Sequence, residues 1–532
     1  MLKQPRDTAV RGDDKGVSDM SGGRSTVSGL DSSHLNGLSD PTDLPSLRSA
    51  LAAEDPEGRL VPLGLDRVAL GPEVVDTVAD AVAEQLARAG RTGDGDIVVL
   101  VDATPIQRAG ADLKSLVEAQ LVDRFTGAHA VRRVVLRGHH PTLHADDDAL
   151  DAATEAVAGA AAVVSVGGGT ITDIAKVATA RHGDGATADA GGIPLVVVQT
   201  AASVDGYTDN VSVILRDGVK RTIPSRWPDV VVADVTTIST APRQLNTAGY
   251  GEVLSMLTAP ADWYLASVLG MDPTFHRAPR DLLAVFGRGL DTWSPGVAQG
   301  DLGAISQLTR MLAVRGVATG VAGTTACLSG VEHLVSHMLD MHNGAHGRPI
   351  GLHGAQVGVA SVVAAAAWEH LFAEFDPTTP PEFPDAEAIA ARKPGVLAAF
   401  AELDPTGKVG EECWRDYSAK LTRWSAGRDT VLAALAEWDR HRAAVDELLA
   451  GSASLAAGLV AAGAAARFAD LDPTVDPATA RWAVANCHLM RNRFTVVDLL
   501  ELLGRWTPAD QDAVTAAAAA AVDAAQTGAV RT

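Results

Sequence analysis

The stretch that decides the fold is VVSVGGGTITDIAKVATA, residues 163–180. An apolar run, three glycines and an amphipathic segment follow one another, and this order predicts a strand, a tight turn and a helix. Gly167, Gly168 and Gly169 permit close approach of another group to the backbone, and the start of the helix presents free N–H groups. The pattern favours a phosphate or pyrophosphate site, with a plain strand–helix turn as the alternative.

Two charged side chains follow in the first turns of the predicted helix. Asp173 and Lys176 lie three residues apart. Lys176 could supply a cation to a phosphate, and Asp173 could accept hydrogen bonds from hydroxyl groups. The glycine spacing matches neither a Walker loop nor the GxGxxG pattern.

Similar apolar runs flank this stretch and alternate with Ala-rich amphipathic segments such as residues 74–90. The runs are IVVLVD, AVRRVVL, AAVVSV, IPLVVVQT and VVVAD. Apolar runs of this kind, separated by helices, predict a parallel sheet covered by helices. From about residue 241 onward these runs stop and long Ala- and Leu-rich helices dominate. The sequence therefore predicts an α/β fold followed by an all-α part.

These changes in composition divide the chain into three predicted parts. Residues 1–56 are rich in Ser, Gly, Asp and Pro, and we predict a disordered tail because little apolar surface could be buried there. Residues 57–240 form the predicted nucleotide-binding α/β domain, and residues 241–532 form the predicted helical domain. The Pro- and Gly-rich breaks in residues 371–411 predict a loop insertion.

The overall composition excludes several classes of partner. The chain carries 44 basic and 66 acidic residues, a formal charge of −22, which argues against a nucleic-acid partner. An anionic substrate would need a local cation. The three Cys are widely spaced, which is typical of a reducing compartment. No signal peptide and no membrane-spanning segment is recognised, so we expect a cytoplasmic protein without membrane insertion.

Polar residues follow two of the predicted strands. Asp102 ends the run IVVLVD, where an acid often binds ribose hydroxyls, although a solvated turn residue is the alternative. Thr200, Ser203 and Asp205 follow the run IPLVVVQT. Ligands of parallel sheets bind at the carboxyl ends of strands, so these three are candidate cofactor and substrate contacts. An Asx turn at Asp205-Gly206 is the competing interpretation.

Five of the 15 His fall within residues 329–354. His333 and His337 are four residues apart, hence on one helix face, and His353 follows a Gly-rich loop. Imidazoles in this arrangement favour a metal site, whose carboxylate ligand we expect from Glu252 in a Gly-flanked apolar helix. The alternative is that His333 and His337 are ordinary helix residues with satisfied hydrogen bonds. We expect the remaining two, His342 and His346, to be exposed in a polar loop.

A series of these motifs resembles a known family. VGGGTITDIAK, QTAASVDGYTDN, AGYGEVLSMLTAPADWYLA, SGVEHLVSHMLDM, LHGAQVGV and MRNRFTVVDLLELLG occur in the order and spacing of the glycerol-1-phosphate dehydrogenases. These belong to the superfamily of iron-containing alcohol dehydrogenases, glycerol dehydrogenases and dehydroquinate synthases. The resemblance covers about residues 57–505. It implies a dehydroquinate synthase-like fold, with a Rossmann-like domain, a helical metal-binding domain and a cleft between them.

The resemblance also implies roles for individual residues. NAD(H), favoured over NADP(H), would lie over the glycine loop. One divalent metal, with zinc favoured over iron or nickel, would be bound by Glu252, His333 and His353. The implied catalytic residues are His337 and Asp205, with Asp205 also contacting substrate hydroxyls. The implied cofactor residues are Asp102, Gly167, Gly168, Gly169, Thr170, Asp173, Thr200 and Ser203.

Two positions depart from the family pattern. The family normally has Asp where this chain has Glu252, whose extra methylene changes how a metal can be held. The archaeal members often carry an Arg just before the SG of the histidine motif, and this chain reads TTACLSG there. Lys220, our predicted phosphate contact, and Arg221 could replace that cation.

The favoured function is NAD(P)H-linked, metal-dependent interconversion of dihydroxyacetone phosphate and sn-glycerol 1-phosphate. The alternatives are a related dehydrogenase of another polyol or of a secondary-metabolite ketone, a dehydroquinate synthase-like cyclase, and a non-catalytic nucleotide-binding protein. By analogy with the superfamily we expect a homo-oligomer acting on a small phosphorylated molecule.

Overall fold

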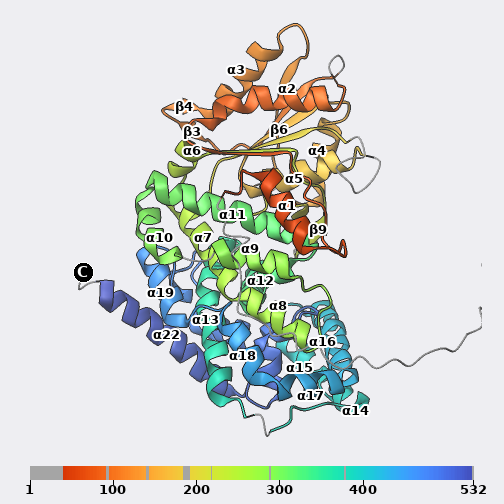
Figure 1. The fold of residues 1–532 in the computed structure, drawn as a ribbon, viewed down its shortest axis with the longest axis vertical. Coiled ribbons are helices and arrows are strands. Elements are labelled where there is room, and N and C mark those ends of the chain that lie inside the picture. The colour runs from red at the N-terminus through yellow and green to blue at the C-terminus, as the bar shows by residue number, and fades with distance from the viewer. Residues whose placement is uncertain are drawn as a thin grey trace, which may run out of the picture.

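The computed structural model describes residues 40–91, 95–138, 143–183, 192–216, 219–286, 289–376 and 379–529. One half of the molecule is a sheet covered by helices, and the other half is helical (Figure 1). The strands are β1 (Arg67–Gly71), β2 (Ile97–Val101), β3 (Gln107–Arg108), β4 (Ala111–Asp112), β5 (Val131–Val135), β6 (Ala162–Gly167), β7 (Leu195–Gln199), β8 (Val211–Arg216), β9 (Val219–Pro224) and β10 (Val230–Asp234).

Helices occur in both halves. Those of the sheet half are α1 (Leu44–Glu54), α2 (Val78–Arg88), α3 (Leu113–Phe125), α4 (Asp147–Ala156), α5 (Gly169–Ala180) and α6 (Val235–Ser239). The helical half contains α7 (Arg243–Val253), α8 (Ala259–Val268), α9 (Arg277–Phe286), α10 (Leu290–Gln299), α11 (Leu302–Ala322), α12 (Val331–Ala345), α13 (His353–Glu374), α14 (Ala386–Ala391), α15 (Lys393–Phe400), α16 (Lys408–Ala426), α17 (Arg428–Ala436), α18 (Trp438–Asp446), α19 (Ser452–Ala461), α20 (Pro477–Asn486), α21 (Val496–Leu502) and α22 (Pro508–Ala529). Short 3₁₀ helices are η2 (Val74–Thr77), η3 (Leu254–Leu257), η4 (Thr325–Leu328), η5 (Phe468–Asp470) and η6 (Cys487–Leu489).

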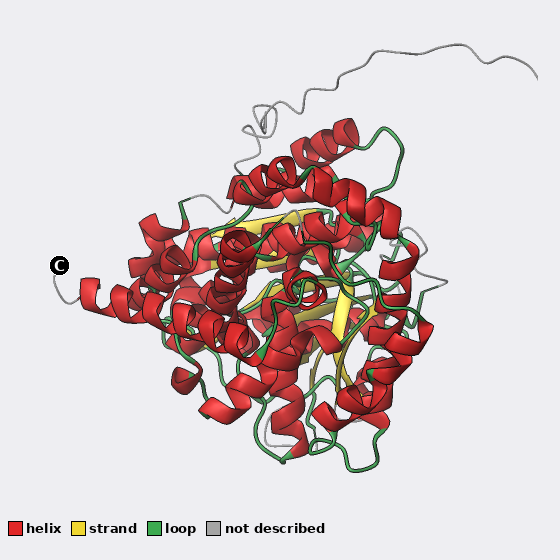
Figure 2. Cartoon of the chain, turned by 90° about the horizontal axis from the view of Figure 1, so that it is seen from below, coloured by secondary structure: helices red, strands yellow, loops and turns green. Residues whose placement is uncertain are grey.

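The main sheet has six parallel strands in the order β1-β10-β7-β6-β2-β5. Helices α2 and α3 lie over one face and α4 and α5 over the other (Figure 1), and the sheet is enclosed by helices in the second view (Figure 2). Strands β2, β6, β7 and β10 are buried at every position, because both of their faces meet helices. The parallel sheet with its helical second half confirms the predicted fold class.

The topology of the main sheet brings together the strand ends that matter for the site. Strands β2, β6 and β7 are adjacent, and their carboxyl ends lead to Asp102, to the glycine loop and to Thr200. Because parallel strands end at one edge of the sheet, these predicted cofactor residues share that edge.

Part of the predicted disordered tail is a helix, so the prediction is wrong for residues 44–54. Leu44, Leu47 and Leu51 are buried at a helical spacing. Asp43 caps the helix by accepting a hydrogen bond from the Ser46 N–H at 3.1 Å. Burial of this leucine stripe stabilises a segment whose composition is otherwise polar. The rest of the predicted tail, residues 1–39, lies outside the described residues.

The predicted loop insertion over 371–411 is also largely wrong. Helix α13 runs on to Glu374, and α14, α15 and the start of α16 occupy much of the remainder. The Asp385 carboxylate caps α14 by accepting from the Ala388 N–H at 2.8 Å, and a proline stands in the first turn of α15. Pro394 therefore stands at the beginning of a helix, a position where the missing N–H costs nothing. Residues 377 and 378 lie outside the described residues.

Helix α13 lies at the centre of the helical half, where it packs on α7, α12 and α19. Its length and hydropathy would suit a membrane span, but 78% of its most apolar window is buried inside the protein. It is thus a core helix. The last strand ends at Asp234, and the elements of the described chain beyond it are helices. One hydrophobic cluster joins both halves, so a domain boundary at residue 240 stays a prediction.

Candidate active site

Three side chains from three helices meet in the helical half. Glu252 stands near the end of α7, His333 in the first turn of α12, and His353 opens α13. The His333 Nε2 lies 3.4 Å from Glu252 Oε1, and the His353 Nε2 lies 3.9 Å from Glu252 Oε2. One donor atom from each lies within 4.8 Å of the others, which suits a shared metal ion. We call these three residues the triad.

The outer nitrogen of each imidazole has its own partner. His333 Nδ1 lies 2.9 Å from Glu332 Oε1, so this nitrogen carries the proton. His353 Nδ1 lies 3.0 Å from Ser336 Oγ, which in turn donates to Gln356 Oε1 at 2.7 Å. We therefore assign the Nε2 lone pairs of both rings to the inside of the triad.

The Glu252 carboxylate is buried and only half satisfied. Its side chain is 3% exposed, and its Oε2 has no hydrogen-bond partner within the described structure. Burial raises the pKa of Glu252, but the His353, Arg315 and His333 side chains outweigh it and hold the pKa well below its usual range. A charged, buried oxygen facing two imidazole lone pairs fits a cation and would be costly without one.

Arg315 is a member of the site that the sequence analysis missed. It lies in α11 with 1% exposure, and its Nη2 donates to Glu252 Oε1 at 2.6 Å. The same Nη2 lies 3.2 Å from Asp205 Oδ2, while Nη1 donates to Ser255 Oγ at 2.5 Å. A signal existed, because Arg315 is the single charged residue in the apolar run LAVRGVATGVA. Such a residue rarely enters a core unpaired.

Asp205 and His337 lie beside the triad. Burial raises the pKa of Asp205 to about 6, although Arg315 acts in the opposite direction. The backbone at Asp205 also forms a turn, since its carbonyl accepts from the Thr208 N–H at 3.2 Å. The ring of His337 stacks on that of His353 with 5.7 Å between centroids, and lies 6.5 Å from the ring of His333. Both predicted catalytic residues are therefore close to the triad.

The glycine loop lies between β6 and α5 as predicted. Gly168 caps α5 without a side-chain hydrogen bond, Gly169 is partly exposed and Thr170 is exposed. A Cβ added at Gly168 would stand in open space, whereas at Gly167 and Gly169 it would lie 2.5 Å and 2.7 Å from neighbouring side chains. The uncapped helix start with an open backbone face fits a phosphate group.

Comparison with known proteins identifies the family of this chain. Residues 71–242 match the family described as iron-containing alcohol dehydrogenase. A glycerol-1-phosphate dehydrogenase [NAD(P)+] of Haloquadratum walsbyi is 31% identical over 298 residues, covering 56% of this chain and 76% of that protein. That of Bacillus subtilis is 26% identical over 383 residues, covering 71% and 89%. The chain belongs to the glycerol-1-phosphate dehydrogenase family.

A solved maleylacetate reductase from Rhizobium sp. strain MTP-10005 aligns with a TM-score of 0.47 at 17% identity, covering 87% of this chain and 98% of the reductase. As a member of the glycerol-1-phosphate dehydrogenase family, the chain is an oxidoreductase that acts on CH–OH groups.

Two residues near the loop have internal roles that the prediction did not include. Lys176 is fully buried, and its Nζ donates to Asp209 Oδ1 at 2.6 Å and to the Gly206 carbonyl at 2.8 Å. Asp173 accepts from the Val213 N–H at 3.2 Å, and burial raises its pKa to about 7. Lys176 is therefore not a phosphate cation, and Asp173 faces this internal network instead of the open helix start.

Four further predicted site residues lie at the ends of strands or in strand β9. Asp102 follows β2, but its carboxylate binds the Thr104 hydroxyl at 2.8 Å and Lys114 Nζ at 2.8 Å. Thr200 is buried and Ser203 is half-buried in the loop after β7. The side chain of Lys220, in β9, lies outside the described residues.

The other two histidines of the cluster lie away from the triad. His346 is exposed as predicted, but His342 is half-buried, with its ring 4.3 Å from that of His346 and 6.0 Å from that of Trp482. The exposure predicted for His342 is thus wrong, because α20 packs against α12 there.

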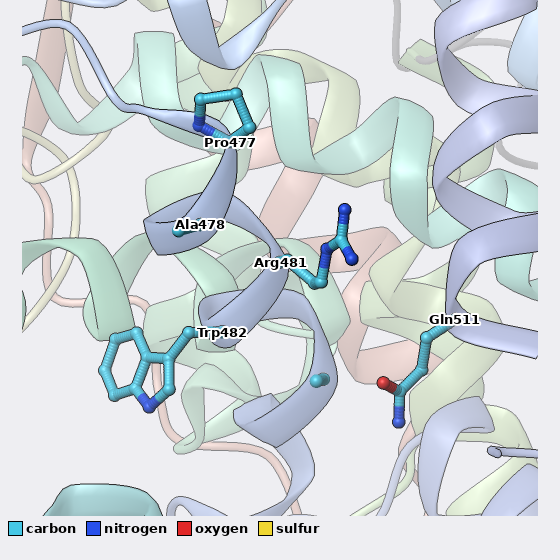
Figure 3. A pocket seen from close by; sticks show the side chains of 6 residues that line it. Pro477, Ala478, Arg481, Trp482 and Gln511 are labelled. Carbon is cyan, nitrogen blue, oxygen red and sulfur yellow. The ribbon is translucent and has the colours of Figure 1, made fainter. Parts of the chain in front are cut away.

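A pocket between α20 and α22 is separate from the active site. Figure 3 shows its lining, with Arg481 and Gln511 pointing toward the same space and Trp482 on the opposite side of α20. The full lining is Pro477, Ala478, Arg481, Trp482, Ala485 and Gln511. It contains no carboxylate and no imidazole among these residues, so it offers nothing to the reaction.

Proposed function

We propose that this chain interconverts dihydroxyacetone phosphate and sn-glycerol 1-phosphate with NAD(P)H and a divalent metal. The observation that carries the proposal is the triad, in which two oriented imidazoles face a buried carboxylate oxygen that has no hydrogen-bond partner in the described structure. The names of the glycerol-1-phosphate dehydrogenase relatives support the substrate and the nucleotide. In the direction of reduction, the ketone, NAD(P)H and a proton give the secondary alcohol and NAD(P)⁺.

The triad would hold the metal through Glu252, His333 and His353. When bound, the cation supplies a Lewis acid that stabilises negative charge on the ketone oxygen of the substrate. Zinc suits imidazole and carboxylate ligands, and iron or nickel are the other candidates. Glu332 and Ser336 hold the two rings in the tautomer that leaves Nε2 free.

The glycine loop would hold the cofactor's pyrophosphate at the start of α5. When bound, the nicotinamide supplies the hydride, and the protein supplies orientation. Gly168 leaves room for the phosphate. Asp102 ends the adjacent strand, where an acid commonly binds ribose hydroxyls, and NADH stays the favoured nucleotide even though Lys114 pairs with this carboxylate at 2.8 Å. Asp205 orients substrate hydroxyls, and His337, stacked on His353, relays the proton to the substrate oxygen.

The phosphate of the substrate requires a cation, and Arg491 is the candidate that the fold offers. Its backbone is left-handed, with φ of 62°, and no hydrogen bond or ion pair of its side chain is found within the described chain. The segment is fixed by Arg493, whose Nη1 donates to the Ser329 carbonyl at 2.5 Å, just before α12. Strand β9, which carries Arg221, packs on the same helix.

The electrostatic surroundings of Arg491 favour an anion. Burial, then the charges of Arg493 and Arg221, lower the pKa of Arg491 to about 10. Arg221 itself pairs with Glu412 at 3.2 Å, so it is already partly neutralised. A phosphate beside Arg491 would relieve the repulsion among these cations.

The function is tested by NADH oxidation with metal-stripped protein reloaded with zinc, iron or nickel. Dihydroxyacetone phosphate and unphosphorylated dihydroxyacetone are offered side by side. We expect metal-dependent turnover of the phosphate, and its loss in His353→Ala. Turnover of neither compound by metal-loaded protein would reject this substrate in favour of another ketone. Catalytic turnover of a substrate without net NADH consumption would favour a cyclase.

The phosphate assignment has its own test in Arg491→Ala. The ratio of kcat/KM for dihydroxyacetone phosphate to that for dihydroxyacetone should fall by about tenfold or more, as expected for a lost charged hydrogen bond. Arg415→Ala, an exposed arginine of α16, serves as the control. An equal loss for both compounds would reject Arg491 as the phosphate contact.

A further inference from the structure

Arg315 joins two parts of the active site through one nitrogen atom. Its Nη2 donates to Glu252 Oε1 at 2.6 Å and lies 3.2 Å from Asp205 Oδ2. Glu252 belongs to the triad, and Asp205 belongs to the loop after β7. The guanidinium therefore links the candidate metal ligand to the candidate substrate residue across the boundary between the helical half and the sheet half.

The position of this guanidinium is fixed by the fold. Arg315 is 1% exposed, and its Nη1 donates to Ser255 Oγ at 2.5 Å. Ser255 Oγ in turn donates to the Glu252 carbonyl at 3.2 Å, so the arginine is anchored to the same helix end as the ligand. The neighbouring Gly316 admits no side chain, since an added Cβ would lie 2.2 Å from Thr208 Oγ1.

The charges at this point do not balance without a further cation. With the imidazoles of His333 and His353 neutral, as metal ligation requires, Glu252 and Asp205 contribute two negative charges and Arg315 contributes one positive charge. Arg315 engages one oxygen of Glu252, and the other oxygen, Oε2, is buried without a hydrogen-bond partner in the described structure. An arginine in this place lowers the cost of the buried carboxylates, yet it also repels any second cation.

We propose that Arg315 is a built-in counter-cation of the metal centre, which keeps the metal-free site folded and limits how tightly a divalent cation binds. The inference rests on the proposed function, because it takes the triad as the metal site. A purely supporting role for Arg315 predicts the opposite change in metal affinity when the side chain is removed. If Arg315 only oriented Glu252, its removal would weaken metal binding, as the loss of partners of metal ligands usually does.

The test compares Arg315→Met, Arg315→Lys and the control Arg310→Met in the full chain. Arg310 lies five residues earlier on α11 and pairs with Asp40, and no hydrogen bond or ion pair joins it to the triad in the described structure. Each protein is stripped of metal, its melting temperature is recorded, and its zinc affinity is measured by competition with a chromophoric chelator.

For Arg315→Met we expect a lower melting temperature without metal and a zinc dissociation constant reduced by about tenfold or more, because one repelling charge is gone. Arg315→Lys keeps the charge and should restore both values toward wild type. Unchanged or weaker zinc binding by Arg315→Met would overturn the proposal. If Arg315→Met does not fold, Arg315→Gln is measured with the same expectation.

The failure of this proposal can be told apart from failure of the proposed function. If the wild type binds no zinc, or if His353→Ala binds it equally well, the proposed function fails. Zinc uptake by Arg315→Met alone, lost on adding His353→Ala, would still support the counter-cation. If neither the wild type nor Arg315→Met takes up zinc, both the counter-cation proposal and the proposed function are overturned.

Discussion

At the scale of single residues, the orientation of His333 depends on one carboxylate. Glu332 is fully buried, and its Oε1 accepts from His333 Nδ1 at 2.9 Å and from the Gly330 N–H at 2.7 Å. Its Oε2 accepts from the Thr258 hydroxyl at 3.0 Å. We predict that Glu332→Gln weakens zinc binding by about tenfold, because a neutral amide makes the imidazole a poorer ligand.

The measurement for Glu332→Gln is zinc affinity by chelator competition, with the melting temperature as a check on folding. The matched control is Glu369→Gln, which removes a carboxylate that caps α19 through Ser452 and contacts no histidine in the described structure. Equal zinc affinity of Glu332→Gln and wild type would show that the carboxylate has no influence on the metal.

How far the site could be predicted also differs residue by residue. Residue type and local spacing predict a metal site at Glu252 and the histidines, and the family resemblance selects Glu252, His333 and His353 as ligands. The structure brings these three residues together. Arg315 was not found, since its contacts depend on how α11 packs against α7 and on nothing local. The prediction of Lys176 as a phosphate cation is wrong for the same reason. Its position in a helix does not determine which way the long side chain turns, and in the structure it turns to Asp209.

At the scale of elements, the strand–loop–helix unit at Gly168 makes a prediction about cofactor binding. The backbone of Gly168 has φ of −82°, which any residue tolerates, and its Cβ position is open. Gly168→Ala should therefore fold normally. Its methyl group would occupy the space over the start of α5, so we predict that NADH binds about tenfold more weakly or worse.

Fluorescence titration with NADH measures this effect of Gly168→Ala. Gly395→Ala, in α15, is the control, because its Cβ would also meet open space but lies outside the loop. Unchanged NADH affinity in Gly168→Ala would place the nucleotide elsewhere.

The junction of α16 and α21 makes a prediction about acid stability. Glu501 accepts from the Tyr417 hydroxyl at 2.6 Å and from Arg392 Nη1 at 2.7 Å. Burial raises the pKa of Glu501, but His488, Tyr417 and Arg392 outweigh it and lower the pKa to about 2. Because the pKa of Glu501 is 4.5 in the unfolded chain and about 2 in the fold, its charged form stabilises the fold at any pH above 4.5. This stabilisation is lost as the pH falls from 4.5 toward about 2.

We therefore predict that Glu501→Gln lowers the free energy of unfolding at pH 7 by on the order of 2 kcal/mol. The deficit relative to wild type should shrink as the pH falls below 4.5. Urea unfolding at pH 7, 5 and 3 measures it, with the exposed Glu437→Gln as the control. If the difference in unfolding free energy between Glu501→Gln and wild type does not change with pH, the lowered pKa of Glu501 is contradicted.

The elements themselves were predictable where one local pattern dominated. Strands β2, β6, β7 and β10 coincide with apolar runs that are buried on both faces. Helices α1, α14 and α15 are not predicted from the sequence, because Ser, Pro and Asp are also typical of loops. In the structure Asp43 and Asp385 cap helices, and a proline stands in the first turn of α15.

At the scale of the whole molecule, glycines set the distance between the parts that form the site. An added Cβ at Gly249 of α7 would lie 1.8 Å from the Ala202 carbonyl oxygen, in the loop after β7. At Gly251 it would lie 2.2 Å from the Gly354 carbonyl oxygen, in α13. Helix α7 is thereby held against both the sheet half and α13, with Glu252 next to the second contact.

We predict that Gly251→Ala separates α7 from α13 and so moves Glu252 away from His353. Overpacking of this kind costs about 1–3 kcal/mol, which a core of this size tolerates, while a metal site requires its ligands within a few tenths of an ångström. Zinc affinity should then fall by more than about tenfold while the protein still folds. Gly358→Ala, whose Cβ would lie 2.6 Å from Gly251 Cα, should act in the same direction, and Gly395→Ala should have no effect. Wild-type zinc affinity in a folded Gly251→Ala protein would mean that the spacing of these helices does not determine the metal site.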